Sequence, residues 1–172
     1  MRRPVIYVLE AGSISGGVRV VYEHLNRLHA RGRHGEVYSL DANRPTWFRL
    51  NPAIPWVKFD HYDHLGRHLV KREAIKVATW WRTAQVVAEA SRPGEGHYFI
   101  QDIEAHYYSA PSQKRQVMET YDLPLIQFTD SIYASNALGC PFIGLGIDLD
   151  VYKPLDLRRR LNSVLALSRP QV

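Results

Sequence analysis

Three polar residues that could bind and activate a sugar follow an apolar run at residues 97–100. Gln101, Asp102 and Glu104 carry an amide and two carboxylates, which suit hydroxyls that both donate and accept hydrogen bonds. Either carboxylate could act as a base or support positive charge at an anomeric carbon. Their spacing does not establish the facing pair of a glycosidase, and helix capping or an ion pair explains them without catalysis. We predict Asp102 and Glu104 as catalytic residues and Gln101 as a substrate-binding residue.

A loop of small residues offers a second kind of chemistry near the N-terminus. The apolar run at residues 5–9 stops at this loop, and a helical pattern begins at Gly16 and Gly17. A strand, a Gly-rich turn and a helix in this order leave backbone N–H groups at a positive helix end, where a phosphate can bind. The spacing is not GxGxxG, and the lysine of a Walker loop is missing. A plain tight turn is the alternative to a substrate-binding role for the two glycines.

Thr79, Trp80 and Thr83 lie at the end of another expected strand, at residues 74–79, and are also predicted to bind substrate. Trp80 and its neighbour Trp81 could stack on a sugar or fill the core, and we expect the core for one of them. Three histidines recur nearby at helical spacing, but their segment is polar, which favours solvated histidines over a metal site. No metal is expected. These histidines are His61, His64 and His68.

Alternating strand and helix patterns must position these residues. They predict an α/β fold, with a Rossmann-like, mainly parallel sheet and helices on both faces. Strands are expected at residues 5–9, 36–40, 56–59, 74–79, 97–100, 125–128 and 141–143. Helices are expected at residues 17–31, 61–72, 80–90, 112–121 and 131–138, with Gly32 and Gly139 as stops.

Composition limits the classes of function. The chain has 172 residues, of which 45% are hydrophobic and 23% charged, as in ordinary globular domains. Its apolar runs are too short to span a bilayer. The single cysteine, Cys140, excludes an internal disulfide and fits a reducing cytosol. The net charge of +5 is compatible with several anionic partners, but no basic–aromatic repeat is present, so nucleic acid is not expected.

Three passages together resemble the N-terminal half of the family 4 retaining glycosyltransferases, which have the two-domain GT-B fold. They are the Gly-Gly loop and first helix at residues 15–25, the strand and helix cap at residues 128–134, and residues 146–154. The last passage, Gly-Ile-Asp-Leu-Asp-Val-Tyr-Lys-Pro, is similar to the hinge that leads to the family's nucleotide-sugar domain. The resemblance implies an acceptor-binding domain at residues 1–153. Residues 154–172 would be a linker and the first strand of a truncated donor domain.

A narrower likeness is to bacterial rhamnosyltransferases that build cell-surface polysaccharides, carried by residues 78–84, 98–104 and 119–121. It implies retaining transfer of a sugar, with L-rhamnose from a dTDP donor as one candidate, to a polysaccharide or lipid-linked acceptor. Gly16 and Gly17 would face the donor diphosphate. The nucleotide sugar is a co-substrate, and no cofactor is implied. Because most donor contacts would come from the missing C-terminal domain, the isolated chain is expected to be inactive.

Two other readings stay open. The chain could be a non-catalytic fragment that binds a glycan or a partner domain. It could also be an unrelated Rossmann-like nucleotide binder, with Asp41 after the second strand holding a ribose. The expected location is cytoplasmic, with peripheral contact at the inner face of the plasma membrane through Arg67, Lys71 and Arg72.

Overall fold

The computed structural model describes residues 3–41, 43–146, 149 and 153. Most of the predicted hinge at residues 146–154 lies outside these residues. The sequence also predicts a short helix at residues 155–161 and a strand at residues 163–167. Both, with the whole proposed second domain at residues 154–172, lie outside the described residues.

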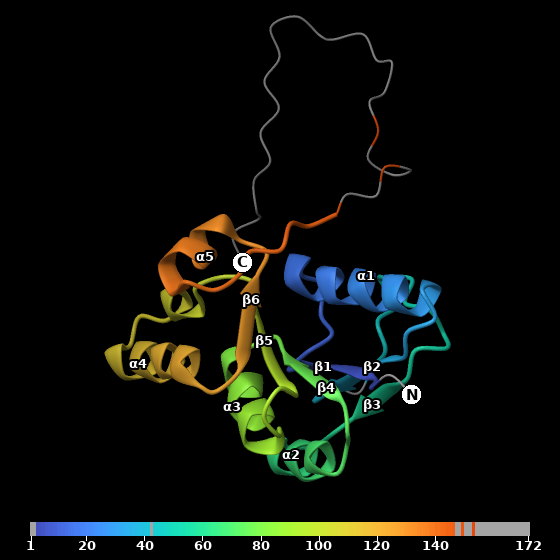
Figure 1. Ribbon diagram of the computed structural model, residues 1–172, viewed down its shortest axis with the longest axis horizontal. Helices are drawn as coiled ribbons and strands as arrows, with labels where there is room; N and C mark the ends of the chain where they lie inside the picture. Colours follow the sequence, from blue (N-terminus) through green and yellow to red (C-terminus); the bar gives the residue numbers. More distant parts are fainter. Residues whose placement is uncertain (1–2, 42, 147–148, 150–152, 154–172) are drawn as a thin grey trace, which may run out of the picture.

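The described residues form a six-stranded parallel sheet, which confirms the predicted α/β fold (Figure 1). The strand order is β3-β2-β1-β4-β5-β6, so the chain grows outward from β1 in one direction and then returns to β1's other side. Such a reversal places a crevice at the carboxyl ends of the central strands, where open α/β sheets bind ligands. The strands are β1 (Val5–Leu9), β2 (Gly35–Ser39), β3 (Trp56–Lys58), β4 (Ile75–Ala78), β5 (Gly96–Ile100) and β6 (Ile126–Thr129).

Helices cover both faces of this sheet, with α1 on one face and α2 and α3 on the other (Figure 1). Alternation along the strands explains the two layers, because successive strand residues point to opposite faces. Tyr7 and Leu9 pack in the cluster that contains α1, whereas Ile6 and Val8 pack in the cluster that contains α2 and α3. The helices are α1 (Gly16–Ala30), α2 (Tyr62–Val70), α3 (Trp81–Ala90), α4 (Pro111–Glu119) and α5 (Ile132–Leu138), with 3₁₀ turns η1 (Glu104–Tyr107) and η2 (Thr120–Asp122).

Capping residues set the ends of α1 and α5. The Ser15 hydroxyl accepts the N–H of Val18 at 3.1 Å, and the Ser131 hydroxyl accepts the N–H of Ala134 at 3.2 Å. Gly139 ends α5 with a φ of 68°, a left-handed backbone conformation that residues other than glycine rarely adopt. The start of α5 at a Ser131 cap and its stop at Gly139 are therefore confirmed.

The predicted strand at residues 141–143 is wrong. Phe142 forms an isolated bridge with Thr129, the last residue of β6, and neighbouring backbone groups bond only to Thr129. The segment meets the sheet where β6 ends, so it has no further strand residues to pair with. The helix predicted at residues 112–121 is also shorter, since α4 ends at Glu119 and the tighter turn η2 follows.

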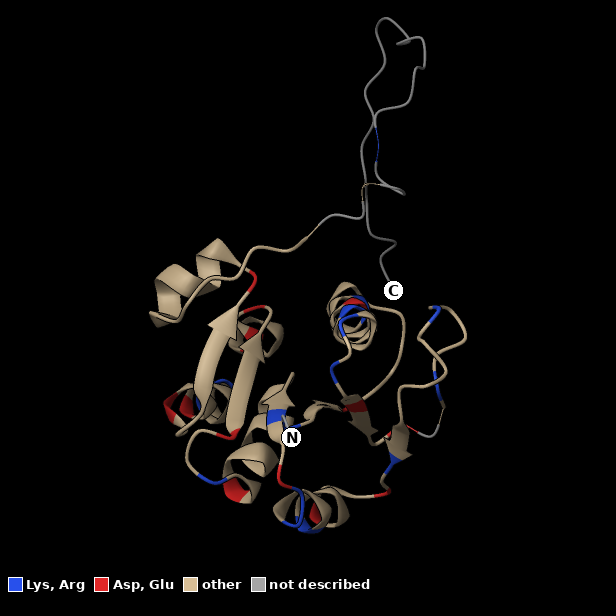
Figure 2. Ribbon diagram, turned by 45° about the vertical axis from the view of Figure 1, so that its right-hand side comes forward, with Lys and Arg blue, Asp and Glu red and all other residues tan. Residues whose placement is uncertain are grey.

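Charged residues of both signs are dispersed over α1 to α4, whereas α5 carries none (Figure 2). At the amino edge of the sheet, the buried Lys76 ammonium donates to Glu95 at 2.9 Å and to the carbonyl of Ala90 at 2.9 Å. This buried pair ties the start of β4 to the end of α3. No helix in the described part of the chain is long and apolar enough to cross a bilayer.

Candidate functional site

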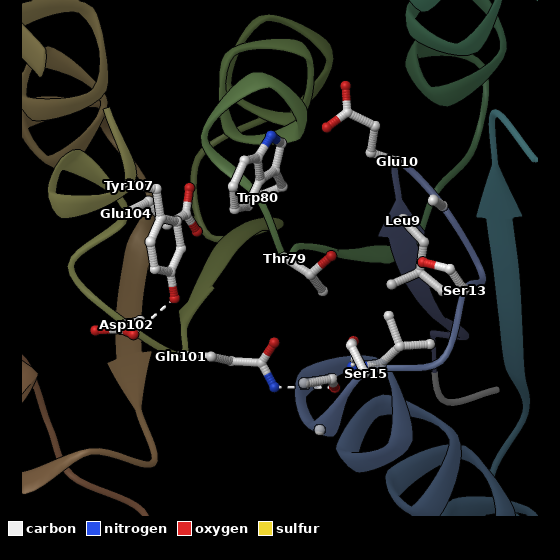
Figure 3. Close-up of a pocket in the computed structure, with 14 residues that line it drawn as sticks. Leu9, Glu10, Ser13, Ser15, Thr79, Trp80, Gln101, Asp102, Glu104 and Tyr107 are labelled. Carbon is white, nitrogen blue, oxygen red and sulfur yellow. Dashed lines mark hydrogen bonds between the residues drawn. The ribbon is translucent and has the colours of Figure 1, made fainter. Parts of the chain in front are cut away.

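A pocket of about 540 Å³ opens at the carboxyl edge of the sheet, at the point where the strand order reverses (Figure 3). Its wall comes from four places: the loop after β1, the first turn of α1, the end of β4 and the segment after β5. The volume lies in the range of small-molecule sites. The predicted residues Gly16, Gly17, Thr79, Trp80, Gln101, Asp102 and Glu104 all line this pocket.

The two glycines occupy different surroundings in the first turn of α1. A Cβ on Gly17 would clash with the Gln101 amide oxygen, whereas a Cβ on Gly16 would meet nothing within 4 Å. The Gln101 amide donates to the Gly17 carbonyl at 3.0 Å and so joins the end of β5 to α1, as Figure 3 shows. Gly17 therefore permits a close contact that fixes this side of the pocket. Gly16 leaves the helix N-terminus, with its unsatisfied N–H groups, open to a ligand.

The segment from the end of β4 to the first turn of α3, residues 79–83, contains some residues that line the pocket and some that support them. Trp80 lines the pocket, while Trp81 is 5% exposed and belongs to the core, as expected for one of the pair. Thr83 is fully buried and does not line the pocket. Its hydroxyl accepts the N–H groups of Thr79 at 3.1 Å and Trp80 at 3.0 Å. The structure thus gives Thr83 the place of a cap that holds Thr79 and Trp80, not that of a predicted substrate contact.

Asp102 lies at the open side of the pocket. Its carboxylate accepts the N–H of Ile103 at 2.8 Å and the hydroxyl of Tyr107 at 2.6 Å. The Tyr107 ring is stacked with Trp80 at an interplanar angle of 14°, with the ring centroids 6.1 Å apart. Asp102, Tyr107 and Trp80 therefore place a carboxylate beside an aromatic wall.

Glu104 is the buried carboxyl of the pocket, with 3% of its surface exposed. It accepts the N–H of Trp81 at 2.7 Å and thereby caps α3 from a distant part of the chain. Burial raises the pKa of Glu104 to about 8, and the nearby carboxylates of Asp102 and Glu10 add to the rise. At neutral pH this group is mostly protonated, so it suits hydrogen-bond donation or proton transfer better than support of positive charge.

Glu10 and Tyr107 are among the lining residues that the site prediction missed. Glu10 follows β1 directly, and its carboxylate accepts the Tyr62 hydroxyl at 2.6 Å and lies 3.6 Å from Arg82. A carboxylate at a strand's carboxyl end was the available signal, the same one that marked Asp102. Tyr107 had no such signal, since it reaches the pocket through η1.

The loop after β1 is held by the long loop at residues 43–55. Gly12 is buried, and its carbonyl accepts from the Trp47 indole at 3.0 Å and from the Tyr22 hydroxyl at 3.4 Å. Its N–H donates to Asp41 at 3.2 Å. The other Asp41 oxygen accepts the N–H of Asn43 at 3.1 Å. Asp41 thus braces the loop, and it is not among the residues that line the pocket.

The three histidines do not converge. His61 and His64 have ring centroids 5.8 Å apart, while His68 packs against Tyr38 and Phe59. Within the residues that the structure describes, no group of three His, Cys, Asp or Glu side chains is placed to hold a metal ion.

The arrangement can bind an anion at the start of α1 and a polyhydroxylated molecule against Trp80, Gln101 and Asp102. A scan of the chain against known protein families finds no match. A search of curated proteins likewise finds no match.

Proposed function

We propose that this chain is the acceptor-binding domain of a retaining glycosyltransferase of the GT-B type. The observation that carries the proposal is the pocket at the point where the strand order reverses, which has two chemically different sides. One side is the N-terminus of α1, which suits a diphosphate, and the other side carries polar and aromatic groups, which suit a sugar. The sequence resemblance to family 4 supplies the reaction.

The donor diphosphate faces Gly16 in this proposal. Ser15 already satisfies the N–H of Val18, whereas the first two N–H groups of a helix have no acceptor within it. The open space at the Gly16 Cβ position allows a phosphate to approach the backbone closely. The helix dipole adds a favourable field for the negative charge.

The acceptor glycan lies against Trp80, Tyr107 and Asp102. Aromatic faces cover the apolar side of a sugar ring, and the Asp102 carboxylate accepts hydrogen bonds from its hydroxyls. Asp102 is the exposed carboxylate and is assigned the role of orienting or deprotonating the acceptor hydroxyl. Glu104, mostly protonated, donates a hydrogen bond from the floor of the pocket.

A nucleotide-sugar domain of the kind that the family resemblance implies completes the reaction in this proposal. That domain binds most of the nucleotide sugar, with dTDP-L-rhamnose as the first candidate donor. The acceptor is a polysaccharide or a lipid-linked glycan at the cytoplasmic face of a membrane. Both halves must close on the substrates before transfer, which excludes water from the reacting centre.

Transfer itself tests the proposal. Residues 1–172, alone and joined to a nucleotide-sugar domain of the family, are incubated with labelled dTDP-rhamnose and other nucleotide sugars, together with lipid-linked and polysaccharide acceptors. We expect a labelled product with the donor's anomeric configuration, and no turnover by residues 1–172 alone. Absence of transfer from every donor, product of inverted configuration, or robust turnover by residues 1–172 alone would contradict it.

A further inference from the structure

The side chains that line the pocket carry charge of one sign. Glu10 and Asp102 supply two carboxylates, Glu104 adds a carboxyl group that burial keeps mostly protonated, and none of the described lining residues is Lys, Arg or His. A pocket that accepted an anionic sugar would need a basic partner for it, since an unpaired buried charge is costly. The charge pattern therefore bears on which sugars can enter.

The surroundings of the carboxylates leave most of this negative charge uncompensated. Asp102 is bonded to two neutral donors, the Ile103 N–H and the Tyr107 hydroxyl. Glu104 accepts from the Trp81 N–H and, because burial keeps it mostly protonated, adds little charge of its own. Glu10 has a cation nearby, but Arg82 is 3.6 Å away and half exposed, so water screens that pair.

The carboxylates also flank the aromatic wall. Figure 3 shows Asp102, Glu104 and Tyr107 on one side of Trp80 and Glu10 on the other. A sugar ring placed against this wall would have carboxyl groups on both sides. The N-terminus of α1, by contrast, forms a separate wall through Ser15, Gly16 and Gly17.

We infer that the acceptor wall of this pocket selects an uncharged or amino-bearing sugar and rejects uronic acids and phosphorylated sugars. The inference rests on the proposed function, because it names the acceptor class of that same site. Like charges brought together cost affinity and so serve to exclude wrong ligands. Hydroxyl and amino groups instead donate hydrogen bonds to carboxylates.

Calorimetric titration with three matched probes tests the inference. The probes are β-1,4-linked trimers of glucose, glucosamine and glucuronate, which share ring and linkage and differ in charge. At about pH 6, ordinary carboxyl groups are ionised and sugar amines are largely protonated. We expect the glucose and glucosamine trimers to bind about tenfold or more tightly than the glucuronate trimer.

Two substitutions make the test specific to the carboxylates. Asp102→Asn and Glu10→Gln keep the shape and much of the hydrogen bonding but remove the charge. Each should tighten glucuronate binding and weaken glucosamine binding, a change of opposite sign that a loss of folding cannot produce. Glu89→Gln, on the exposed face of α3, removes the same charge away from the pocket and should change neither.

The outcomes separate the two proposals. Equal binding of glucuronate and glucose trimers would overturn the charge selection while leaving glycan binding intact. A parallel change for all three probes in both pocket variants would also overturn it. If none of the three trimers binds, the glycan pocket itself is contradicted, and the charge selection falls with it.

Discussion

Gly16 and Gly17 are neighbours in sequence, yet only Gly17 is packed against another side chain. Gln101 occupies the space where a Gly17 side chain would lie, whereas the corresponding space at Gly16 is open. A family resemblance treats the pair as one motif, but the structure assigns them different physical roles. Gly17 fixes the pocket through Gln101, and Gly16 leaves room for a ligand.

Substitution by alanine should separate the two roles. Gly17→Ala displaces Gln101 and breaks its bond to the Gly17 carbonyl, which should cost about 0.5–1.5 kcal/mol of unfolding free energy. Gly16→Ala should leave stability unchanged or raise it by up to about 1 kcal/mol, because alanine favours helix. Chemical denaturation measures both. In a Gln101→Ala background the Gly17→Ala penalty should vanish, and its persistence there would contradict the proposed contact.

Glu104 should make stability depend on pH in a particular direction. An ordinary glutamate ionises near pH 4.5, but burial raises the pKa of Glu104 to about 8, so between these values the folded state holds the extra proton. Stability therefore falls as pH rises through this window, and ionised Glu104 costs on the order of 5 kcal/mol.

The glutamine of Glu104→Gln cannot ionise but can still accept the Trp81 N–H. The variant's free energy of unfolding should therefore not show the decrease with rising pH that is due to Glu104. Denaturation of both proteins at several values between about pH 5 and pH 9 measures the difference, which should favour the variant increasingly at high pH. Parallel curves for the two proteins would show that burial does not hold the Glu104 proton.

At the scale of elements, the loop after β1 is held by α1, by Asp41 after β2 and by Trp47 of the loop at residues 43–55. Trp47, Tyr22 and Asp41 all bond to the Gly12 peptide, and a Cβ on Gly12 would lie 2.9 Å from Trp56. The long loop is therefore a support for the pocket wall, not a simple connection between β2 and β3.

Trp47→Phe should loosen that wall while keeping an aromatic ring in place. The loss of the indole bond to Gly12 should cost about 0.5–1.5 kcal/mol. Amide hydrogen exchange at residues 11–15 should become faster, because the loop opens more readily. Thr46→Ala, an exposed neighbour in the same loop, is the control. Unchanged exchange in Trp47→Phe would mean that the loop holds its shape alone.

The periodic elements could be predicted from the sequence because their signals are local. The apolar run of β1, the Ser131 cap and the Gly139 stop each act within a few residues. The misplaced strand at residues 141–143 had the right composition but meets β6 only at its last residue, Thr129. Pairing of this kind depends on strand order, which the local pattern does not contain.

The candidate site was predictable where a polar residue directly follows a strand, as at Asp102. Glu10 carries that same signal and was missed. The place of Tyr107 in the pocket and the bond from the Gly12 N–H to Asp41 depend on contacts between segments that are distant in sequence. Thr83 shows the converse limit, because residue type and position suggested a ligand contact while its hydroxyl is used by the backbone.

At the scale of the molecule, the basic residues that give the chain its positive charge differ in role, since some stabilise the fold and others are exposed. Arg72 forms an ion pair with buried Glu36 and lies over the Tyr38 ring, so it belongs to the fold. Arg67 and Lys71 are exposed on and just after α2. Of the basic stretch expected to meet a membrane, these two residues are exposed, whereas Arg72 is partly buried.

Sedimentation with vesicles at low salt checks this surface. Each basic side chain near an anionic bilayer contributes about 1 kcal/mol, so the Arg67→Ala/Lys71→Ala double variant should bind roughly tenfold or more weakly. The Lys114→Ala/Arg115→Ala variant removes the same charge from α4 and should bind like the wild type. If both variants lost vesicle binding equally, net charge alone would explain the binding, and the surface at Arg67 and Lys71 would have no special role. Equal binding to neutral and anionic vesicles would remove the electrostatic explanation.

The most direct measurement is an NMR titration of the isotopically labelled chain with the glucose trimer. If the pocket is an acceptor site, shifts should concentrate at its lining, in the Trp80 indole and the backbone of residues 101–107, with smaller changes at residues 15–17. The amino edge of the sheet, around Lys76 and Glu95, should stay unchanged. Shifts centred on that opposite edge, or no shifts at all, would contradict the assignment of the pocket to a glycan.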